Sequence, residues 1–264
     1  LRGDLSAVCA ALSASGTAAE IALSLALAAL YLADRNRFCP AGECGAALTP
    51  RMLRIALPLA SSAYARSALN TFRQLLVPRG LRLSGLSAES ALAGYGVING
   101  MAMPVLLLPT CLPLSVAELL VPALTEMQVA GEHKRVRRSV REMLGKTFLL
   151  SLGAAAVFFV FARPLGMLLY GSAEAARFLR LLAPMVPFLY TDIVTDGCLK
   201  GLGQMMASMA FNIAEAALGL VLVWALLPRW ALTGYLVTLY ICEVFNFTLS
   251  LLRLRQIING DGSH

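Results

Sequence analysis

The feature that most limits how this chain can fold is a succession of apolar segments, each long enough to cross a lipid bilayer. A spanning helix needs about 20 mostly apolar residues. Of the 264 residues, 58% are hydrophobic and 14% are charged, and soluble domains carry about 25% charged residues. The chain is therefore predicted to be an all-α, polytopic membrane protein. About seven spans are expected on this length criterion: residues 8–32, 52–77, 91–127, 140–162, 175–199, 207–227 and 231–252.

The third of these segments is too long for one straight crossing. At 1.5 Å per residue it would run ~55 Å, whereas the hydrocarbon core is ~30 Å thick. It could form a re-entrant hairpin broken at Pro104, Pro109 and Pro113, or one kinked helix. The charge pattern favours the kinked helix, because the basic segments 34–54 and 129–146 then share one side. By the positive-inside rule, that side and the C-terminus are cytoplasmic.

A polar stripe interrupts the second apolar segment. Ser62, Arg66, Asn70 and Arg73 lie at positions i, i+4, i+8 and i+11, so they share one helix face, and Gln74 lies beside them. One arginine at bilayer depth costs ~2.5–3.5 kcal/mol on insertion scales. Two on one face indicate a water-filled cavity with an anionic guest, such as a phosphate or pyrophosphate held by guanidinium forks. The expected substrate-binding residues are Arg66, Asn70, Arg73 and Gln74.

An alternative role for these arginines is structural. Glu20, Glu118 and Glu243 are available as ion-pair partners on other helices. Arg73 could also extend its side chain to the membrane surface.

Acidic residues near the other spans form the second candidate site. Asp192, Asp196 and Lys200 share one helix face, with Asp196 and Lys200 in the acid-first order that helices favour. They could form a structural salt bridge, a gate or a coupling-ion site, with Asp192 the better ion ligand because it lies deeper. Two further stripes contain Asn212 with Glu215, and Glu243 with Asn246 and Ser250. The expected ion-coupling or gating residues are Asp192, Asp196, Lys200, Glu215 and Glu243.

Enzymatic, metal-binding and nucleic-acid-binding functions find no support in the sequence. The chain contains no HExxH, GxSxG or P-loop motif, and its histidines are His133 and His264. The six cysteines are scattered, and Cys39 with Cys44 lacks the further ligands that a zinc site needs. The net charge of +7 arises in short loops rather than on a soluble basic domain. We expect no metal site, no nucleic-acid partner and no enzyme activity.

Three sequence segments together resemble the second lobe of the multidrug/oligosaccharidyl-lipid/polysaccharide (MOP) exporter superfamily. They are RMLRIALPLASSAYARSALNTFRQLLVPRGL from residue 51, VAELLVPALTEMQVAGEHKRVRR from residue 116 and LKGLGQMMASMAFNIAEAALGL from residue 199. The order and spacing of the segments agree over about residues 8–256. The chain is most similar to the stage V sporulation protein B-like and oligosaccharide flippase group of that superfamily.

This resemblance implies a domain organisation. Residues 1–33 would be the last helix of an N-terminal bundle, 34–51 a cytoplasmic linker, 52–256 a C-terminal six-helix bundle and 257–264 a cytoplasmic tail. The chain begins at Leu1 and has no signal peptide, so we expect further spans upstream. The N-terminal bundle of the same protein is then an expected partner.

The resemblance also implies a function. We expect a multi-pass flippase of the bacterial cytoplasmic membrane that translocates an undecaprenyl-pyrophosphate-linked oligosaccharide or peptidoglycan precursor by alternating access. Membrane lipids and this lipid-linked saccharide are the expected partners, and no cofactor is expected beyond a coupling ion, H⁺ or Na⁺. The alternatives are a cation-coupled multidrug antiporter of the same superfamily and a non-transporting scaffold for cell-wall assembly.

Overall fold

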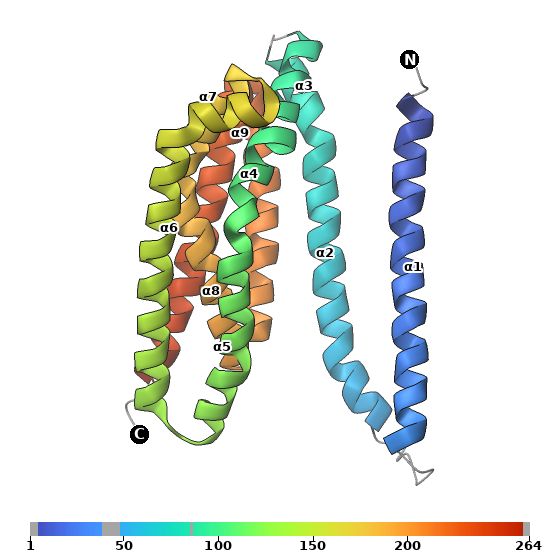
Figure 1. Cartoon of the computed structure of the whole chain (residues 1–264), viewed down its shortest axis with the longest axis vertical. Helices are drawn as coiled ribbons and strands as arrows, with labels where there is room; N and C mark the ends of the chain where they lie inside the picture. Colours follow the sequence, from blue (N-terminus) through green and yellow to red (C-terminus); the bar gives the residue numbers. More distant parts are fainter. Residues whose placement is uncertain (1–4, 39–47, 85–86, 261–264) are drawn as a thin grey trace. The chain divides into compact units, whose positions relative to one another are not determined.

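The computed structural model describes residues 5–38, 48–84 and 87–260, and the regular elements within these ranges are all helical (Figure 1). The chain divides into two compact units, residues 1–56 and 57–264, which are described separately. The first unit contains α1 (Leu5–Phe38), which includes the predicted first span. Its side chains from residue 14 to residue 33 are all exposed, including several leucines, as expected for a helix surrounded by lipid. Cys39, Cys44 and half of the predicted linker lie outside the described residues.

Helix α2 (Leu48–Leu83) carries the polar stripe and leads into the second unit. Next follow α3 (Ala88–Val97), the π-helical η1 (Ile98–Ala102), α4 (Met103–Leu107), the 3₁₀-helical η2 (Leu108–Thr110) and α5 (Cys111–Val129). These five pieces run in one direction across the bundle (Figure 1). The third apolar segment is therefore one kinked crossing rather than a hairpin. Its breaks coincide with Pro104 and Pro109, which supply no backbone N–H for the helix ladder.

The next segments form one long helix and one broken one. Helix α6 (His133–Tyr170) extends the predicted fourth span at both ends and begins with the basic run of residues 133–141. The predicted fifth span is interrupted at Pro184. Helix α7 (Ala173–Leu182) precedes the 3₁₀ turn η3 (Ala183–Met185), and α8 (Val186–Gly201) crosses the bundle.

Helix α9 (Met205–Gly260) contains the last two predicted spans, because the chain folds back on itself at Ala231, where φ is 49° and ψ is −129°. A Cβ on Gly234 would lie 2.7 Å from the Leu226 carbonyl oxygen, so the two halves of α9 meet closely at this turn. The second half stays helical to Gly260, and the predicted tail therefore begins inside α9, with residues 261–264 outside the described ranges.

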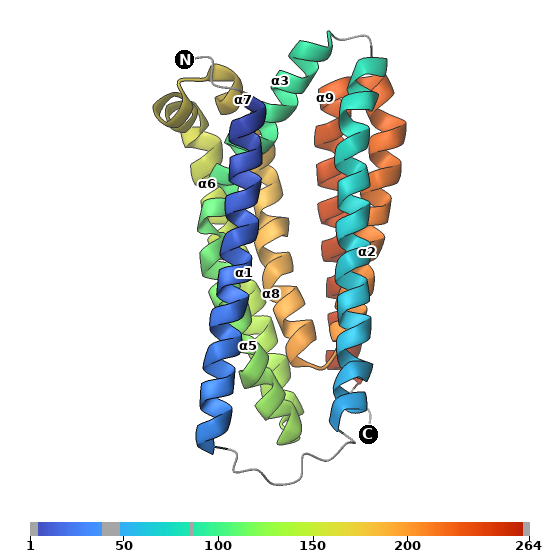
Figure 2. The ribbon, with the colours of Figure 1, turned by 90° about the vertical axis from the view of Figure 1, so that its right-hand side faces the viewer.

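By length and composition, five described segments could cross a membrane: Ala14–Ala33, Leu92–Val129, His133–Tyr170, Ala173–Gly201 and Met205–Asn259. The last contributes two antiparallel halves, which run side by side in Figures 1 and 2. Helix α2 is long enough to span, but it is not among the five segments that meet both criteria. Its status as a span remains a prediction.

Two apolar clusters form the core of the second unit, and polar groups lie between them. One cluster joins α2, η1, α4, α6, α7 and α8 with the middle of α9, and includes Tyr190. The other joins α5, α6, α8 and the end of α9, and includes Val194. Along α8 the two clusters are therefore separated by Thr191, Asp192 and Ile193. A polar site can therefore lie between the two apolar clusters, around residues 191–193 of α8.

Candidate functional site

An acidic cavity of about 440 Å³ opens between α2, α5, α8 and both halves of α9. Among the residues described along its wall are two cations, Arg66 and Lys200. The carboxylates that line it are Glu118, Asp192, Asp196, Glu215 and Glu243. All five predicted ion-coupling or gating residues therefore lie around one space, although they come from separate helices.

A second, basic cavity of about 530 Å³ lies between α2 and the first half of α9. Arg66, Asn70 and Gln74 of the predicted substrate-binding set line it, together with Ser62. Its described charged residues are Arg66 and Lys200. These two cations and Asn212 line both cavities, so the cavities share a wall.

Arg73 does not line either cavity. Its half-buried side chain lies against α9, where a Cβ on Gly219 would be 3.0 Å from the Arg73 Nη1 atom. Both Arg73 and Arg66 interact electrostatically with Glu215. Arg73 is therefore placed to hold α2 against α9, while Arg66 is exposed to both cavities.

Asp192 and Asn246 form a pair between α8 and the second half of α9. Asn246 donates from Nδ2 to Asp192 Oδ2 at 2.8 Å. The Oδ1 atoms of both residues are buried and have no hydrogen-bond partner among the described residues. Ser250 also interacts with the Asp192 carboxyl group. An unsatisfied buried acceptor destabilises a structure by ~1–3 kcal/mol, so the pair marks a position where a further hydrogen bond would be favourable.

Asp196 has a full set of partners, unlike Asp192. Lys200 Nζ lies 2.6 Å from Asp196 Oδ2, and Ser208 donates a hydrogen bond to Asp196 Oδ1. The predicted ion pair between Asp196 and Lys200 is thus confirmed. The ion pair fixes Lys200 on the wall between the two cavities, and the hydrogen bond from Ser208 joins the start of α9 to α8.

The remaining carboxylates interact at longer range. Glu243 interacts electrostatically with Asp192 and Glu215. Among the described residues, no three histidine, cysteine or acidic side chains are close enough to hold a metal ion.

The site residues outside the predicted set include Glu118, Ser208, Asn212 and Asn246. Asn212 and Asn246 lie on the stripes that contain Glu215 and Glu243, so their spacing already placed them on the correct faces. Ser208 had no such signal, because its role depends on the turn that brings α9 back toward Asp196. The five carboxylates of the acidic cavity also differ from the arginine-dominated cavity expected from α2 alone.

Comparison with known proteins identifies the family. Residues 80–225, more than half of the chain, match the family model described as MatE. The chain belongs to the MatE family. The matched part of this MatE protein contains Asp192, Asp196, Lys200 and Glu215, whereas Arg66 and Glu243 lie outside it.

Two curated relatives agree with the assignment to the MatE family. The chain is 28% identical over 203 residues to stage V sporulation protein B of Bacillus subtilis (strain 168), covering 76% of the chain and 39% of that relative. It is 24% identical over 176 residues to sporulation protein YkvU of the same organism, covering 67% of the chain and 40% of that relative. The match thus spans about two fifths of each relative. No solved structure matches the chain.

These findings establish the general class of this MatE protein. It is a multi-pass protein of the cell membrane that belongs to the MOP superfamily. The apolar segments of the described chain agree with that class.

Proposed function

We propose that this MatE protein is part of a flippase that moves an undecaprenyl-pyrophosphate-linked saccharide or peptidoglycan precursor across the membrane. The observation that carries the proposal is the position of Arg66, which borders a basic cavity on one side and an acidic cavity on the other. A pyrophosphate would bind in the basic cavity, with Arg66 as a bidentate donor and Lys200, Asn70 and Gln74 around it.

Arg66 gives a physical route for coupling the two cavities. Without substrate, its charge is balanced by carboxylates such as Glu215, with which it interacts electrostatically. A bound pyrophosphate would compete with these carboxylates for the guanidinium. Protonation of the carboxylates would release Arg66 for the substrate, because a neutral acid attracts a cation much less than a carboxylate does.

Asp192 is the group that we propose carries the coupling proton. A proton on Asp192 Oδ1 would turn one unpartnered oxygen into a donor and allow it to bond to the other, Asn246 Oδ1. Together with the existing bond from Asn246 Nδ2 to Asp192 Oδ2, this would close a cyclic acid–amide pair. A single proton thus satisfies both buried atoms and ties α8 to the second half of α9.

The family supports the general part of this proposal, and the names of both relatives connect them with sporulation. The lipid-linked substrate rests on the chemistry of Arg66 and on the MOP resemblance. Alternating access, with the binding site at the interface of two bundles, is the mechanism that such transporters use.

Native mass spectrometry of the full-length protein with undecaprenyl pyrophosphate tests the substrate. We expect the wild type to retain the lipid and Arg66→Ala to lose it. Arg163→Ala, which removes an exposed arginine of α6 that lines neither cavity, should behave as wild type. Equal retention by Arg66→Ala and wild type would show that the pyrophosphate does not bind at the stripe.

A cation-coupled multidrug antiporter is the second candidate, and the five carboxylates of the acidic cavity favour it. It predicts that the protein in vesicles exports an organic cation such as ethidium in exchange for protons. Glu215→Gln should then abolish ethidium transport, whereas Arg66→Ala should leave it intact. The flippase proposal predicts no ethidium transport by the wild type.

A further inference from the structure

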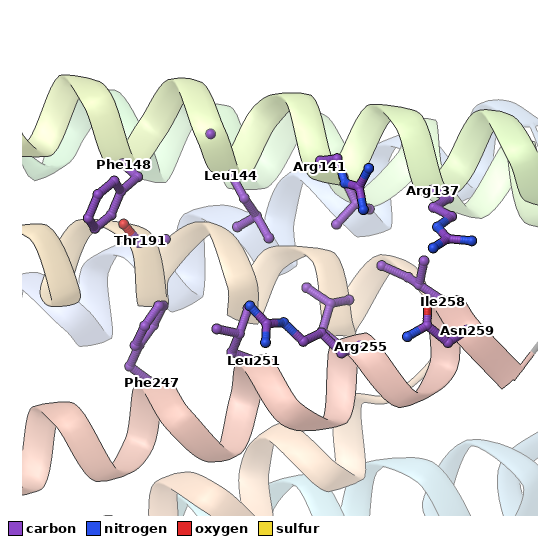
Figure 3. A pocket seen from close by; sticks show the side chains of 13 residues that line it. Arg137, Arg141, Leu144, Phe148, Thr191, Phe247, Leu251, Arg255, Ile258 and Asn259 are labelled. Carbon is purple, nitrogen blue, oxygen red and sulfur yellow. The ribbon is translucent and has the colours of Figure 1, made fainter.

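A groove of about 580 Å³ on another face of the second unit plays no part in the proposed transport site. It lies between the first half of α6, α8 and the end of α9 (Figure 3). Arg137, Arg141 and Arg255 lie along the part nearer the beginning of α6 and the end of α9, and Phe148 and Phe247 lie at the opposite part. No acidic side chain occurs among the described residues that line it.

The three arginines of this groove are available to a ligand. Within the described ranges, Arg137, Arg141 and Arg255 have neither a hydrogen bond nor an ion pair. Their neighbours on the same helices are already engaged: Arg135 pairs with Glu132 at 2.9 Å, and Arg253 donates to Gln204 at 2.8 Å. Unpaired guanidinium groups gathered at one end of an apolar groove are complementary to an anionic group that carries a long apolar chain.

The dimensions of the groove match one leaflet of a bilayer. From Phe247 to Asn259, α9 rises ~18 Å at 1.5 Å per residue, and half of a ~30 Å hydrocarbon core is ~15 Å. With the arginines at the level of the headgroups, Phe148 and Phe247 would lie near the bilayer midplane. Leu251 lines the groove between these ends, and Gly145 leaves it open, since a Cβ there would meet nothing within 4 Å.

The basic end of the groove lies on the side predicted to be cytoplasmic, where anionic lipids attract basic segments. A further basic recess, of about 470 Å³, adjoins it and shares Arg137 and Arg141. We infer that the groove binds one anionic phospholipid of the inner leaflet. The phosphate contacts Arg141 and Arg255, and one acyl chain lies in the groove toward Phe148 and Phe247.

The test uses native mass spectrometry of the full-length protein titrated with phosphatidylglycerol and, for comparison, zwitterionic phosphatidylcholine. We expect the wild type to prefer phosphatidylglycerol. The variant Arg141→Ala/Arg255→Ala should bind this lipid at least about tenfold more weakly, since each basic residue contributes electrostatic affinity at the membrane surface. The matched control is Arg135→Ala/Arg253→Ala. It removes the same charge from the same two helices outside the groove and should retain the lipid.

The acyl-chain part of the inference has its own variant. Gly145→Leu fills the groove without changing charge and should also weaken retention, whereas Gly153→Leu, at another open glycine of α6, should not. Equal loss in both arginine pairs would overturn the site in favour of diffuse surface charge. Unchanged lipid binding by Gly145→Leu would overturn the acyl-chain contact. The same conclusion would follow if glycerol phosphate, which has no acyl chain, competed for the groove as well as phosphatidylglycerol does. Displacement by undecaprenyl pyrophosphate in preference to phosphatidylglycerol would assign the groove to substrate instead.

Discussion

Asp192 and Asn246 are the residues whose chemistry most directly connects the structure with the proposed transport. Their two unpartnered oxygens lie in a buried pair that one proton would complete. Asp196, four residues away on the same helix, has Lys200 and Ser208 as partners and gains nothing comparable from a proton. The same residue type on one helix face therefore has two different environments.

Replacement of Asp192 tests this difference. In Asp192→Asn the side chain can no longer gain or lose a proton, so we expect transport to lose its dependence on a pH gradient while undecaprenyl pyrophosphate binding persists. The measurement is substrate flipping in proteoliposomes with and without an imposed gradient. Glu118→Gln, on the wall of the same cavity, serves as the control and should keep the dependence. A pH response unchanged in Asp192→Asn would rule out this carboxylate as the coupling group.

Gly197 sets the distance between α5 and α8. A Cβ at this position would lie 2.7 Å from Ala117 Cβ and 2.9 Å from Ala117 Cα. We expect Gly197→Ala to reduce stability by ~1–3 kcal/mol through overpacking. Thermal unfolding in detergent, compared with Gly153→Ala, which meets nothing within 4 Å, measures the effect. Equal melting temperatures for the two variants would show that α5 can move away at little cost.

At the scale of elements, the turn within α9 is the unusual feature. Ala231 has φ 49° and ψ −129°, a combination that glycine adopts much more easily than alanine. The turn permits the antiparallel return of α9, which places Asn246 and Glu243 opposite Asp192 and Glu215. The strain at this one residue is therefore compensated by the packing of two whole helical halves.

Glycine at this turn should be better than the natural alanine. We expect Ala231→Gly to stabilise the protein by ~1 kcal/mol. The substitution relieves a positive-φ strain of ~1–3 kcal/mol, but glycine loses more backbone entropy on folding than alanine does, which offsets part of this stabilisation. Ala225→Gly, in the regular helix before the turn, should instead destabilise it by ~0.5–1 kcal/mol. Chemical unfolding of the two variants is the measurement, and destabilisation by both would contradict the proposed strain.

The long third segment shows how much of an element can be inferred from sequence. Charge placement correctly favoured one kinked crossing, and the prolines indicated where the kinks fall. The π-helical turn at residues 98–102 carries no such mark. It is associated with contacts from other helices, where the Tyr235 hydroxyl donates to Asn99 Oδ1 at 3.0 Å. Helix breakers such as proline can be recognised in the local sequence. The hydrogen bond to Asn99 cannot, because its donor lies 136 positions away.

For the whole molecule, the second unit has one distinctly basic end. The corner between α5 and α6, the corner between α8 and α9, and the end of α9 lie together there (Figures 1 and 2). The corner between α6 and α7 and the turn of α9 lie at the opposite end. By the positive-inside rule, we expect the basic end to face the cytoplasm.

Cysteine accessibility tests this orientation. In a full-length protein without its native cysteines, we expect a cysteine at Gly171 or Arg229 to react with a membrane-impermeant maleimide in intact cells. A cysteine at Gly131 or Gln204 should react only after the membrane is permeabilised. The reverse pattern would place the basic end outside, and would contradict the leaflet assigned to the lipid groove.

The sequence by itself determined that this chain is an all-α membrane protein, with basic residues concentrated in a few segments and polar stripes on its helices. These properties are local, because the free energy of transferring a segment into a bilayer is the sum of contributions from its own residues. The tertiary structure alone decided which stripes face one another. It separated Arg73 from Arg66, surrounded Arg66 with carboxylates, and paired Asp192 with Asn246 across 54 residues. Such pairings depend on the close contact between α5 and α8 at Gly197 and on the turn of α9 at Ala231. The residues of the stripes themselves do not specify that packing.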